Sequence, residues 1–214
     1  MKRCYLVRHA QTAWNRDDRL QGHSDVPLSP LGQQQARCLG AYFSRRHLRG
    51  IVTSQLQRSQ QTARMIAAGH GDGVSPLVEA GLAEMHLGAW EGLTPAEVDG
   101  RFDHAYQRWK LSPSSVAIPE AEPLDAFRAR VRASLQKIVE GMGEGEHVVV
   151  SHGGVIAAML ADVLDADYEV LIRRLRLDNA GITAVEFGGQ QPHVLWVNFT
   201  GHLAPDGAPA PVPA

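Results

Sequence analysis

Cysteine is scarce in this sequence. Its 214 residues contain only two, Cys4 and Cys38, which is too few for the disulfide framework of a small secreted domain. Cys4 falls in a strand-like run and Cys38 in a helical pattern, so we expect two buried free thiols in a reducing cytoplasm. The first residues already form a strand-like pattern, and we therefore expect no signal peptide before them and a cytoplasmic location.

A surplus of charge of either sign is also missing. Lys and Arg number 21 against 23 Asp and Glu, which gives a formal net charge of −2. This balance provides no basic surface for nucleic acid or for an anionic membrane, so we predict neither as a partner. No apolar run reaches the length of a membrane span. Any positive site must therefore be built by folding rather than by bulk charge.

Strand-like and helix-like segments alternate along the chain. This alternation predicts a three-layer α/β sandwich with a mostly parallel central sheet and an antiparallel edge strand. Ser29-Pro30 marks one helix start, with an N-cap and a proline at the first helical position, and Pro123 is expected to act in the first turn of another. The expected strands lie at 3–8, 50–53, 76–79, 147–152, 182–187 and 193–199, and the helices at 30–46, 57–68, 95–110, 123–142, 154–163 and 168–175.

The segments between these elements complete the predicted architecture. Residues 1–203 are expected to form a single domain, because the chain is long enough for one sizeable core. Gly188-Gly189-Gln190-Gln191 predicts an antiparallel hairpin of the last two strands. The Ala- and Pro-rich stretch 204–214 predicts an extended, disordered tail. Residues 10–28 and 111–122 form long irregular stretches, which we assign to the walls of a cleft.

Two histidines stand where apolar strands meet polar loops. Cys4-Tyr5-Leu6-Val7 ends in Arg8-His9, and the second run, Val148-Val149-Val150, ends in Ser151-His152 before two glycines. Ligands of open α/β sheets bind outside the carboxyl ends of the strands. If these two strands are neighbours, both imidazoles and Arg8 converge on one point. Such a point suits an anionic substrate and a histidine nucleophile.

A single histidine at a strand end is most often a structural hydrogen-bonding group. Two of them at matching strand ends, one beside an arginine and one before paired glycines, favour a functional site, because perturbed titrating groups gather in clefts. The signatures of other hydrolases are missing: there is no H-E-x-x-H, no C-x-x-C and no G-x-S-x-G. The glycine-rich stretch 69–73 follows no strand and predicts a loop. We expect neither a metal nor a cofactor.

Four sequence blocks, taken in order, resemble the histidine phosphatase superfamily, which includes cofactor-dependent phosphoglycerate mutases and many small phosphatases. Their order is more specific than any one block, and together they extend over about three quarters of the chain. The blocks are L-V-R-H-A-Q-T-A-W-N-x5-Q-G-x2-D-x-P-L-S-x2-G-x2-Q-A (6–36), T-S-Q-L-Q-R-S-Q-Q-T-A (53–63), L-A-E-M-H-L-G-A-W-E-G (82–92) and V-V-V-S-H-G-G (148–154).

The resemblance implies a role for each of five residues. His9 would be the nucleophile that accepts the phosphoryl group, which divides a difficult hydrolysis into two easier steps. Arg8, Arg58 and His152 would stabilise the charge on the phosphoryl oxygens, since phosphoryl transfer depends on positioning and electrostatics. Glu84 would be the general acid and base, a role that suits a partly buried carboxyl. The alternatives are that Arg58 is a solvated helix residue and that Glu84 is a simple surface carboxylate.

The resemblance also implies substrate contacts for Asn15, Gln21, Gly22 and Gly153. In loops, Asn and Gln often only cap turns, and that reading stays open for both side chains.

The sequence departs from the family pattern in two places. Ala10 stands where the family most often has Gly; it is small enough for a phosphate to approach but disfavours a positive φ. Ala121-Glu122-Pro123 replaces the usual Gly-Glu-Ser before a long helix, so the local loop differs from that of the family.

The resemblance points to the small phosphatase branch. We predict hydrolysis of a small phosphorylated metabolite through a phosphohistidine, without a metal, by a monomer or homodimer. One alternative is a phosphoglycerate mutase, which must exclude water with a closing lid. Neither the short segment 111–122 nor the tail 204–214 contains a Lys or Arg for such a lid. Another alternative is a pseudo-phosphatase that binds phosphorylated ligands without turnover.

Overall fold

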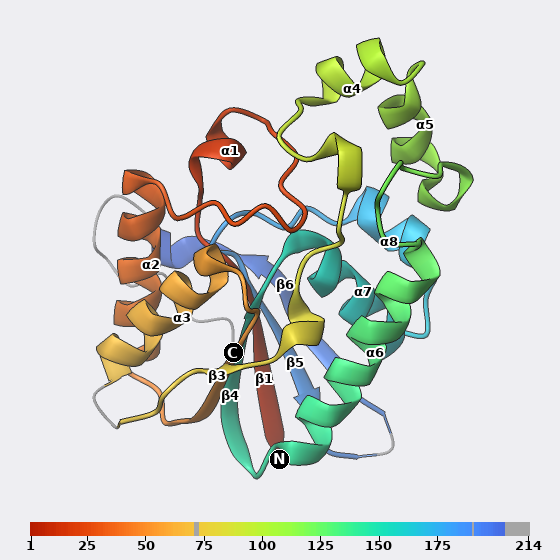
Figure 1. Ribbon diagram of the computed structural model, residues 1–214. Coiled ribbons are helices and arrows are strands. Elements are labelled where there is room, and N and C mark those ends of the chain that lie inside the picture. The colour runs from red at the N-terminus through yellow and green to blue at the C-terminus, as the bar shows by residue number, and fades with distance from the viewer. Residues whose placement is uncertain (71–72, 190, 204–214) are drawn as a thin grey trace.

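The computed structural model describes residues 1–70, 73–189 and 191–203. Within these ranges, six strands form one sheet in the order β3-β2-β4-β1-β5-β6 (Figure 1). The first four positions of this order are joined by parallel pairing, whereas β5 runs antiparallel to β1 and β6 antiparallel to β5. The strands are β1 (Lys2–Arg8), β2 (Leu48–Thr53), β3 (Leu77–Val78), β4 (Gly145–Ser151), β5 (Ile182–Phe187) and β6 (His193–Phe199).

Helices cover both faces of the sheet, as the sequence predicts. In Figure 1, α2 and α3 lie against one face and α6 and α7 against the other, while α4 and α5 project beyond the carboxyl ends of the parallel strands. The helices are α1 (Ala13–Arg16), α2 (Pro30–Phe43), α3 (Gln57–His70), α4 (Pro95–Arg101), α5 (Ala105–Leu111), α6 (Leu124–Gly141), α7 (Gly153–Val163) and α8 (Tyr168–Arg174). The predicted sandwich and its antiparallel hairpin are confirmed, and the one reversed strand in the described sheet is β5, one place in from the edge.

The central strand β1 is buried on both faces. Cys4 and Leu6 belong to the core beneath α6 and α7, whereas Tyr5 and Val7 belong to the core beneath α2 and α3. Successive side chains of a strand point to opposite faces, so a strand with helices on both sides must be apolar throughout. Both cysteines are free; Cys4 is fully buried as expected, and Cys38 only partly.

The structure corrects two predicted helix boundaries. The single helix expected at 95–110 is wrong: it is broken into α4 and α5 at Asp103 and His104, which have φ angles of 48° and 54°. This left-handed conformation cannot continue a right-handed helix. Pro123 is the extended N-cap of α6, not a residue of its first turn, whereas Ser29 and Pro30 begin α2 as predicted.

The two long irregular stretches contain short ordered pieces. Helix α1 lies within 10–28, whose ends are joined by a bridge between Thr12 and Leu28. A 3₁₀ turn, Pro113–Ser115, lies within 111–122. The predicted tail, 204–214, and Gln190 of the hairpin lie outside the described residues. Among the described helices, none combines the length and the apolar character needed to cross a membrane.

Candidate active site

The carboxyl ends of β1 and β4 bring the two predicted histidines together. Parallel register pairs Arg8 with Ser151, and the amide N–H of His9 donates to the carbonyl of Ser151 at 2.9 Å. The imidazole rings of His9 and His152 have centroids 5.1 Å apart, and both side chains are buried. The convergence expected if the two strands are neighbours is therefore present in the structure.

The environment of His9 favours a neutral imidazole with one reactive nitrogen. Its Nδ1 lies 2.8 Å from the carbonyl oxygen of Ala10, which can only accept a hydrogen bond, so Nδ1 carries the proton. Burial, together with the nearby Arg58 and Arg8, holds the pKa of His9 well below its usual value. The unprotonated Nε2 is therefore available as a nucleophile at neutral pH. Ala10 itself does not have a positive φ, so its replacement of Gly strains nothing.

Arg58 is a charged side chain held entirely inside the protein. Its guanidinium donates to the carbonyl oxygens of Gly22 at 2.7 Å and Ser24 at 2.8 Å. Burial lowers the pKa of Arg58 to about 10, an effect that nearby carboxylates, led by Glu84, partly offset. It thus remains a cation at neutral pH although it is fully buried. A buried charge without hydrogen-bonding partners would be strongly destabilising. The carbonyl partners of Arg58 carry no formal charge, so its positive charge can still attract an anion.

Arg8 is the second cation of the site. It donates to the carbonyl of Leu177, and its Nε is buried without a hydrogen-bond partner among the described residues. Burial lowers the pKa of Arg8, with Glu84 and Asp178 acting in the opposite direction. An unpaired donor on a guanidinium is a ready contact for a phosphoryl oxygen.

His152 contacts Arg58 rather than the cavity. The Nε of Arg58 donates to Nδ1 of His152 at 3.3 Å, so the proton of the neutral ring lies on Nε2, 2.9 Å from the hydroxyl of Ser54. Burial, followed by the charge of Arg58, keeps the pKa of His152 well below its usual value. In this geometry His152 orients Arg58, and its expected contact with a phosphoryl group stays a prediction.

Glu84 is partly buried and held at both oxygens by backbone amides. Its Oε1 accepts from the N–H of Met85 at 3.0 Å, and its Oε2 accepts from the N–H of Gly154 at 3.1 Å. A side chain at Gly154 would collide with this carboxylate. Gly154 therefore holds Glu84, while Gly153 is the first residue of α7 and its expected substrate contact stays a prediction.

A cavity of about 260 Å³ collects most of the predicted site residues. His152 and Gly153 are not among its described lining residues. The predicted residues that line it are Arg8, His9, Asn15, Gln21, Gly22, Arg58 and Glu84.

The amide side chains at the cavity are oriented by the protein. The Asn15 oxygen accepts from the backbone N–H of Thr12 at 3.1 Å and from the Asn179 amide at 3.2 Å, which leaves its NH₂ group as the end able to donate to a ligand. The Gln21 oxygen accepts from the Thr12 hydroxyl at 3.0 Å, with the same consequence. Across the described residues, no group of three or more His, Cys, Asp and Glu side chains could hold a metal ion.

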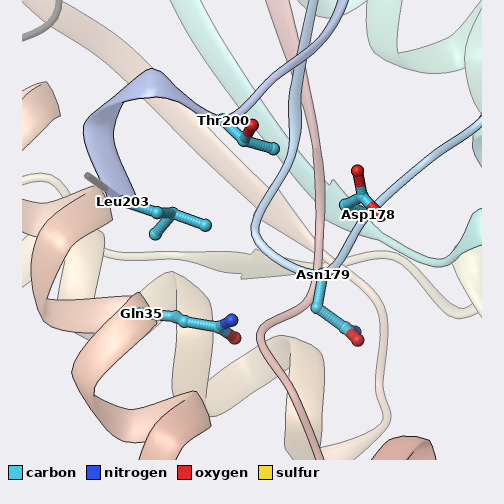
Figure 2. A pocket seen from close by; sticks show the side chains of 5 residues that line it. All are labelled: Gln35, Asp178, Asn179, Thr200 and Leu203. Carbon is cyan, nitrogen blue, oxygen red and sulfur yellow. The ribbon is translucent and has the colours of Figure 1, made fainter. Parts of the chain in front are cut away.

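A second cavity, of about 470 Å³, shares no lining residue with the first. Figure 2 shows the five side chains that line it. Gln35, Asp178, Asn179, Thr200 and Leu203 line it. Asn179 connects the two sites, since its amide also donates to the carbonyl of His9 at 3.0 Å. The carboxylate of Asp178 is already engaged by Asn198 and Arg176.

The model of the histidine phosphatase superfamily (branch 1) matches residues 4–200. The chain belongs to this superfamily. The resemblance seen in the sequence blocks is thereby confirmed for the family, while the roles of individual residues remain predictions.

Several curated proteins are similar to this chain over most of its length. A bifunctional protein of Mycobacterium tuberculosis is 35% identical over 94% of this chain, which covers 55% of that protein. The chain thus spans about half the length of its mycobacterial relatives. A relative from Hydrogenobacter thermophilus, named as a phosphoserine phosphatase, is 31% identical over 94% of this chain and 98% of its own. A relative from Yersinia enterocolitica, named as a phosphoglycerate mutase, is 31% identical over 87% and 86%.

Solved structures agree with this family assignment. A mycobacterial glucosyl-3-phosphoglycerate phosphatase in complex with VO3 superposes with a TM-score of 0.84 at 29% identity, covering 94% of this chain and all (100%) of the other. A mutant phosphoserine phosphatase from Entamoeba histolytica in complex with phosphoserine superposes with a TM-score of 0.81 at 26% identity, covering 95% and 100%.

Glu91 is the main residue of the site that the sequence analysis did not predict. Its carboxylate accepts from the backbone N–H groups of His23 and Ser24, both at 2.8 Å, and of Leu87 at 3.1 Å. It thereby fixes the turn whose carbonyls hold Arg58. Burial opposes the ionised form, but these hydrogen bonds, with that of the Ser24 hydroxyl, lower the pKa of Glu91. A second carboxylate within the block 82–92 was the available signal.

Gly22 is explained by the same contact. It has a φ of +49°, and a Cβ at this position would collide with the Glu91 carboxylate. Its role in this structure is to bring a carbonyl close to Arg58 while leaving space for Glu91.

Arg130 of α6 supports Glu84 through the backbone. Its guanidinium donates to the carbonyls of Gly81 at 2.9 Å, Ala83 at 2.7 Å and Glu84 at 2.8 Å. Glu122, within the unusual Ala-Glu-Pro segment, forms an ion pair with Arg130 and accepts from the N–H of His86 at 2.8 Å. Although Ala121 and Pro123 depart from the family pattern, Glu122 between them still anchors the segment that carries Glu84.

Proposed function

We propose that this protein hydrolyses small phosphate monoesters through a phosphohistidine at His9, without a metal ion. The observation that carries the proposal is the neutral His9, whose unprotonated Nε2 lies in the same cavity as Arg8, Arg58 and Glu84. The phosphorylated ligands of solved relatives, such as phosphoserine, support a small substrate.

The first half of the reaction forms the phosphoenzyme. Nε2 of His9 attacks phosphorus, and the bond between phosphorus and the ester oxygen breaks. Arg8 and Arg58 stabilise the charge on the three remaining phosphoryl oxygens. Protonated Glu84 gives its proton to the departing alkoxide, which leaves as an alcohol.

The second half restores the enzyme. The Glu84 carboxylate takes a proton from a water molecule, which attacks phosphorus and breaks the bond to Nε2. Inorganic phosphate leaves, and His9 is again neutral. The donors on Asn15 and Gln21 are placed to orient the phosphoryl group during both halves.

A phosphoglycerate mutase is the second candidate, because the Yersinia relative carries that name. We expect hydrolysis to dominate, with isomerisation weak or absent. The test incubates the protein with 3-phosphoglycerate and 2,3-bisphosphoglycerate and measures 2-phosphoglycerate against free phosphate, with and without EDTA. Isomerisation faster than phosphate release by orders of magnitude would show that the protein is a mutase and not a phosphatase.

The arm with EDTA tests the absence of a metal ion. Loss of activity in EDTA, restored by a divalent ion, would contradict the metal-free mechanism.

Glu91→Gln is expected to lower kcat/KM about 10- to 100-fold, because losing charge-assisted hydrogen bonds of about 1.5–3 kcal/mol frees the turn that holds Arg58. The inhibition constant of vanadate should rise by a similar factor, which a purely structural role of Glu91 would not cause. Steady-state kinetics and thermal melting measure both effects. Glu169→Gln is the matched control, since that carboxylate accepts hydrogen bonds from Ser112 and Ser114 instead. Equal losses in the two variants would refute the positioning role.

A further inference from the structure

The part of the cavity away from His9, Arg8 and Arg58 is mostly apolar. It is lined by Leu20 in the loop after α1, Leu87 just before the 3₁₀ turn Gly88–Trp90, Tyr106 and Trp109 of α5, and Ile172 of α8. In Figure 1 the helices α4 and α5 lie beyond the carboxyl ends of the strands, above the point where β1 and β4 end. The alcohol part of an ester bound at His9 would meet this wall.

Two aromatic side chains in this apolar lining are held in place by packing on other rings. Tyr106 and Trp109 are stacked, with ring centroids 5.9 Å apart and planes at 27°. Trp109 also packs edge-on against Trp90 at 6.3 Å, and Trp90 is only 1% exposed. Because a buried ring anchors them, Tyr106 and Trp109 present a preformed aromatic surface rather than two mobile side chains.

The charges on this wall do not suit a second anion. Among the described lining residues, the cations are Arg8, Arg58 and Arg19, besides the neutral His9. Arg19 is already engaged by the carboxylate of Glu97 at 3.1 Å and the carbonyl of Gly92 at 2.6 Å. Asp18 adds a carboxylate to the same lining. An anionic group on the alcohol would therefore meet a paired cation and a like charge.

We propose that the alcohol part of the substrate is uncharged and carries an aromatic or other flat apolar group, which packs on Tyr106 and Trp109. This inference rests on the proposed phosphatase function. It separates this chain from relatives whose names or ligands include phosphoserine, which carries both a carboxylate and an ammonium group.

Three alkyl phosphates test the proposal: 2-phenylethyl phosphate, ethyl phosphate and O-phosphoserine. All leave as alkoxides, so differences in kcat/KM report mainly on recognition of the alcohol. We expect 2-phenylethyl phosphate to exceed each of the others about tenfold or more. Trp109→Leu should reduce the ratio of 2-phenylethyl to ethyl phosphate about tenfold, and Asp18→Asn should improve the use of phosphoserine. Trp196→Leu, on β6, is the matched control and should leave the ratio unchanged.

The outcomes distinguish a failure of this inference from a failure of the proposed phosphatase function. Wild-type preference for phosphoserine over 2-phenylethyl phosphate would overturn the inference, as would a Trp109→Leu variant whose ratio equals that of the wild type. If the wild type hydrolyses none of the three esters or p-nitrophenyl phosphate, the proposed function fails instead. In that case calorimetric titration with the same three unreacted esters tests the wall directly. Tighter binding of 2-phenylethyl phosphate would support it, and tighter binding of phosphoserine would contradict it.

Discussion

His9→Ala is expected to lower kcat for phosphate ester hydrolysis on the order of 10⁴-fold or more, as removal of a covalent nucleophile does in other enzymes. The physical reason is that the unprotonated Nε2, exposed to the cavity by the hydrogen bond of Nδ1 to Ala10, disappears with the ring. Rapid quench with a ³²P-labelled ester measures the phosphoenzyme directly. The wild type should retain label that is labile in acid and stable in base, as a phosphohistidine is, and the variant should retain none.

The matched control for this variant is His47→Ala, which removes an exposed histidine immediately before β2. Its kcat and its trapped label should equal those of the wild type. Hydrolysis by His9→Ala at the wild-type rate would exclude His9 as the nucleophile. A wild type that binds esters but never retains label or releases phosphate would instead identify a pseudo-phosphatase.

Glu84→Gln is expected to reduce kcat/KM for alkyl phosphates about 10²- to 10⁴-fold, the usual contribution of a general acid. Glutamine has nearly the same shape as glutamate but cannot give a proton to the leaving alkoxide. The loss should be far smaller for p-nitrophenyl phosphate, whose leaving group needs little protonation. Comparing kcat/KM isolates phosphorylation of the enzyme, because this ratio does not depend on the later hydrolysis of the phosphoenzyme.

The second half of the reaction gives an independent measurement of Glu84. Without a base to activate water, the phosphoenzyme of Glu84→Gln should accumulate, and stopped-flow should record a burst of p-nitrophenol before slow turnover. Glu186→Gln is a suitable control, since that carboxylate pairs with Arg3 at 3.1 Å and neither residue lines the cavity. Equal losses of kcat/KM on alkyl and aryl esters would contradict the role of Glu84 as an acid.

The parts of the fold that sequence predicts well are those governed by local periodicity. Leu6 and Val7 are both apolar because helices cover both faces of β1, and the same holds for Val149 and Val150 of β4. The glycines at 188 and 189 predict the hairpin of β5 and β6. The break at Asp103 and His104 has no comparable signal. The apolar pattern of the sequence continues through these two residues, although both have a positive φ.

In the candidate site, too, residues within sequence blocks could be predicted and contacts between distant segments could not. His9, Arg58 and Glu84 stand in blocks that resemble a family, and the structure brings them to one cavity. Contacts that join distant segments were not predictable: Glu91 holds the turn at Ser24, and Arg130 holds the backbone of Glu84. Such contacts depend on tertiary packing, and no spacing along the chain encodes them.

The pairing of Arg8 with Ser151 has a consequence for how this chain can vary. Side chains of a strand alternate between faces, so deleting one residue from β1 or β4 would turn an imidazole to the wrong side of the sheet. The segment from α4 to α5, residues 95–111, carries Tyr106 and Trp109, follows Glu84 and Glu91 in the chain, and contributes no strand to that pairing. Insertions and deletions within it would alter the aromatic surface and leave His9, Glu84 and His152 in place. Substrate preference can therefore change through the length of one segment, while the strand register keeps the two imidazoles together.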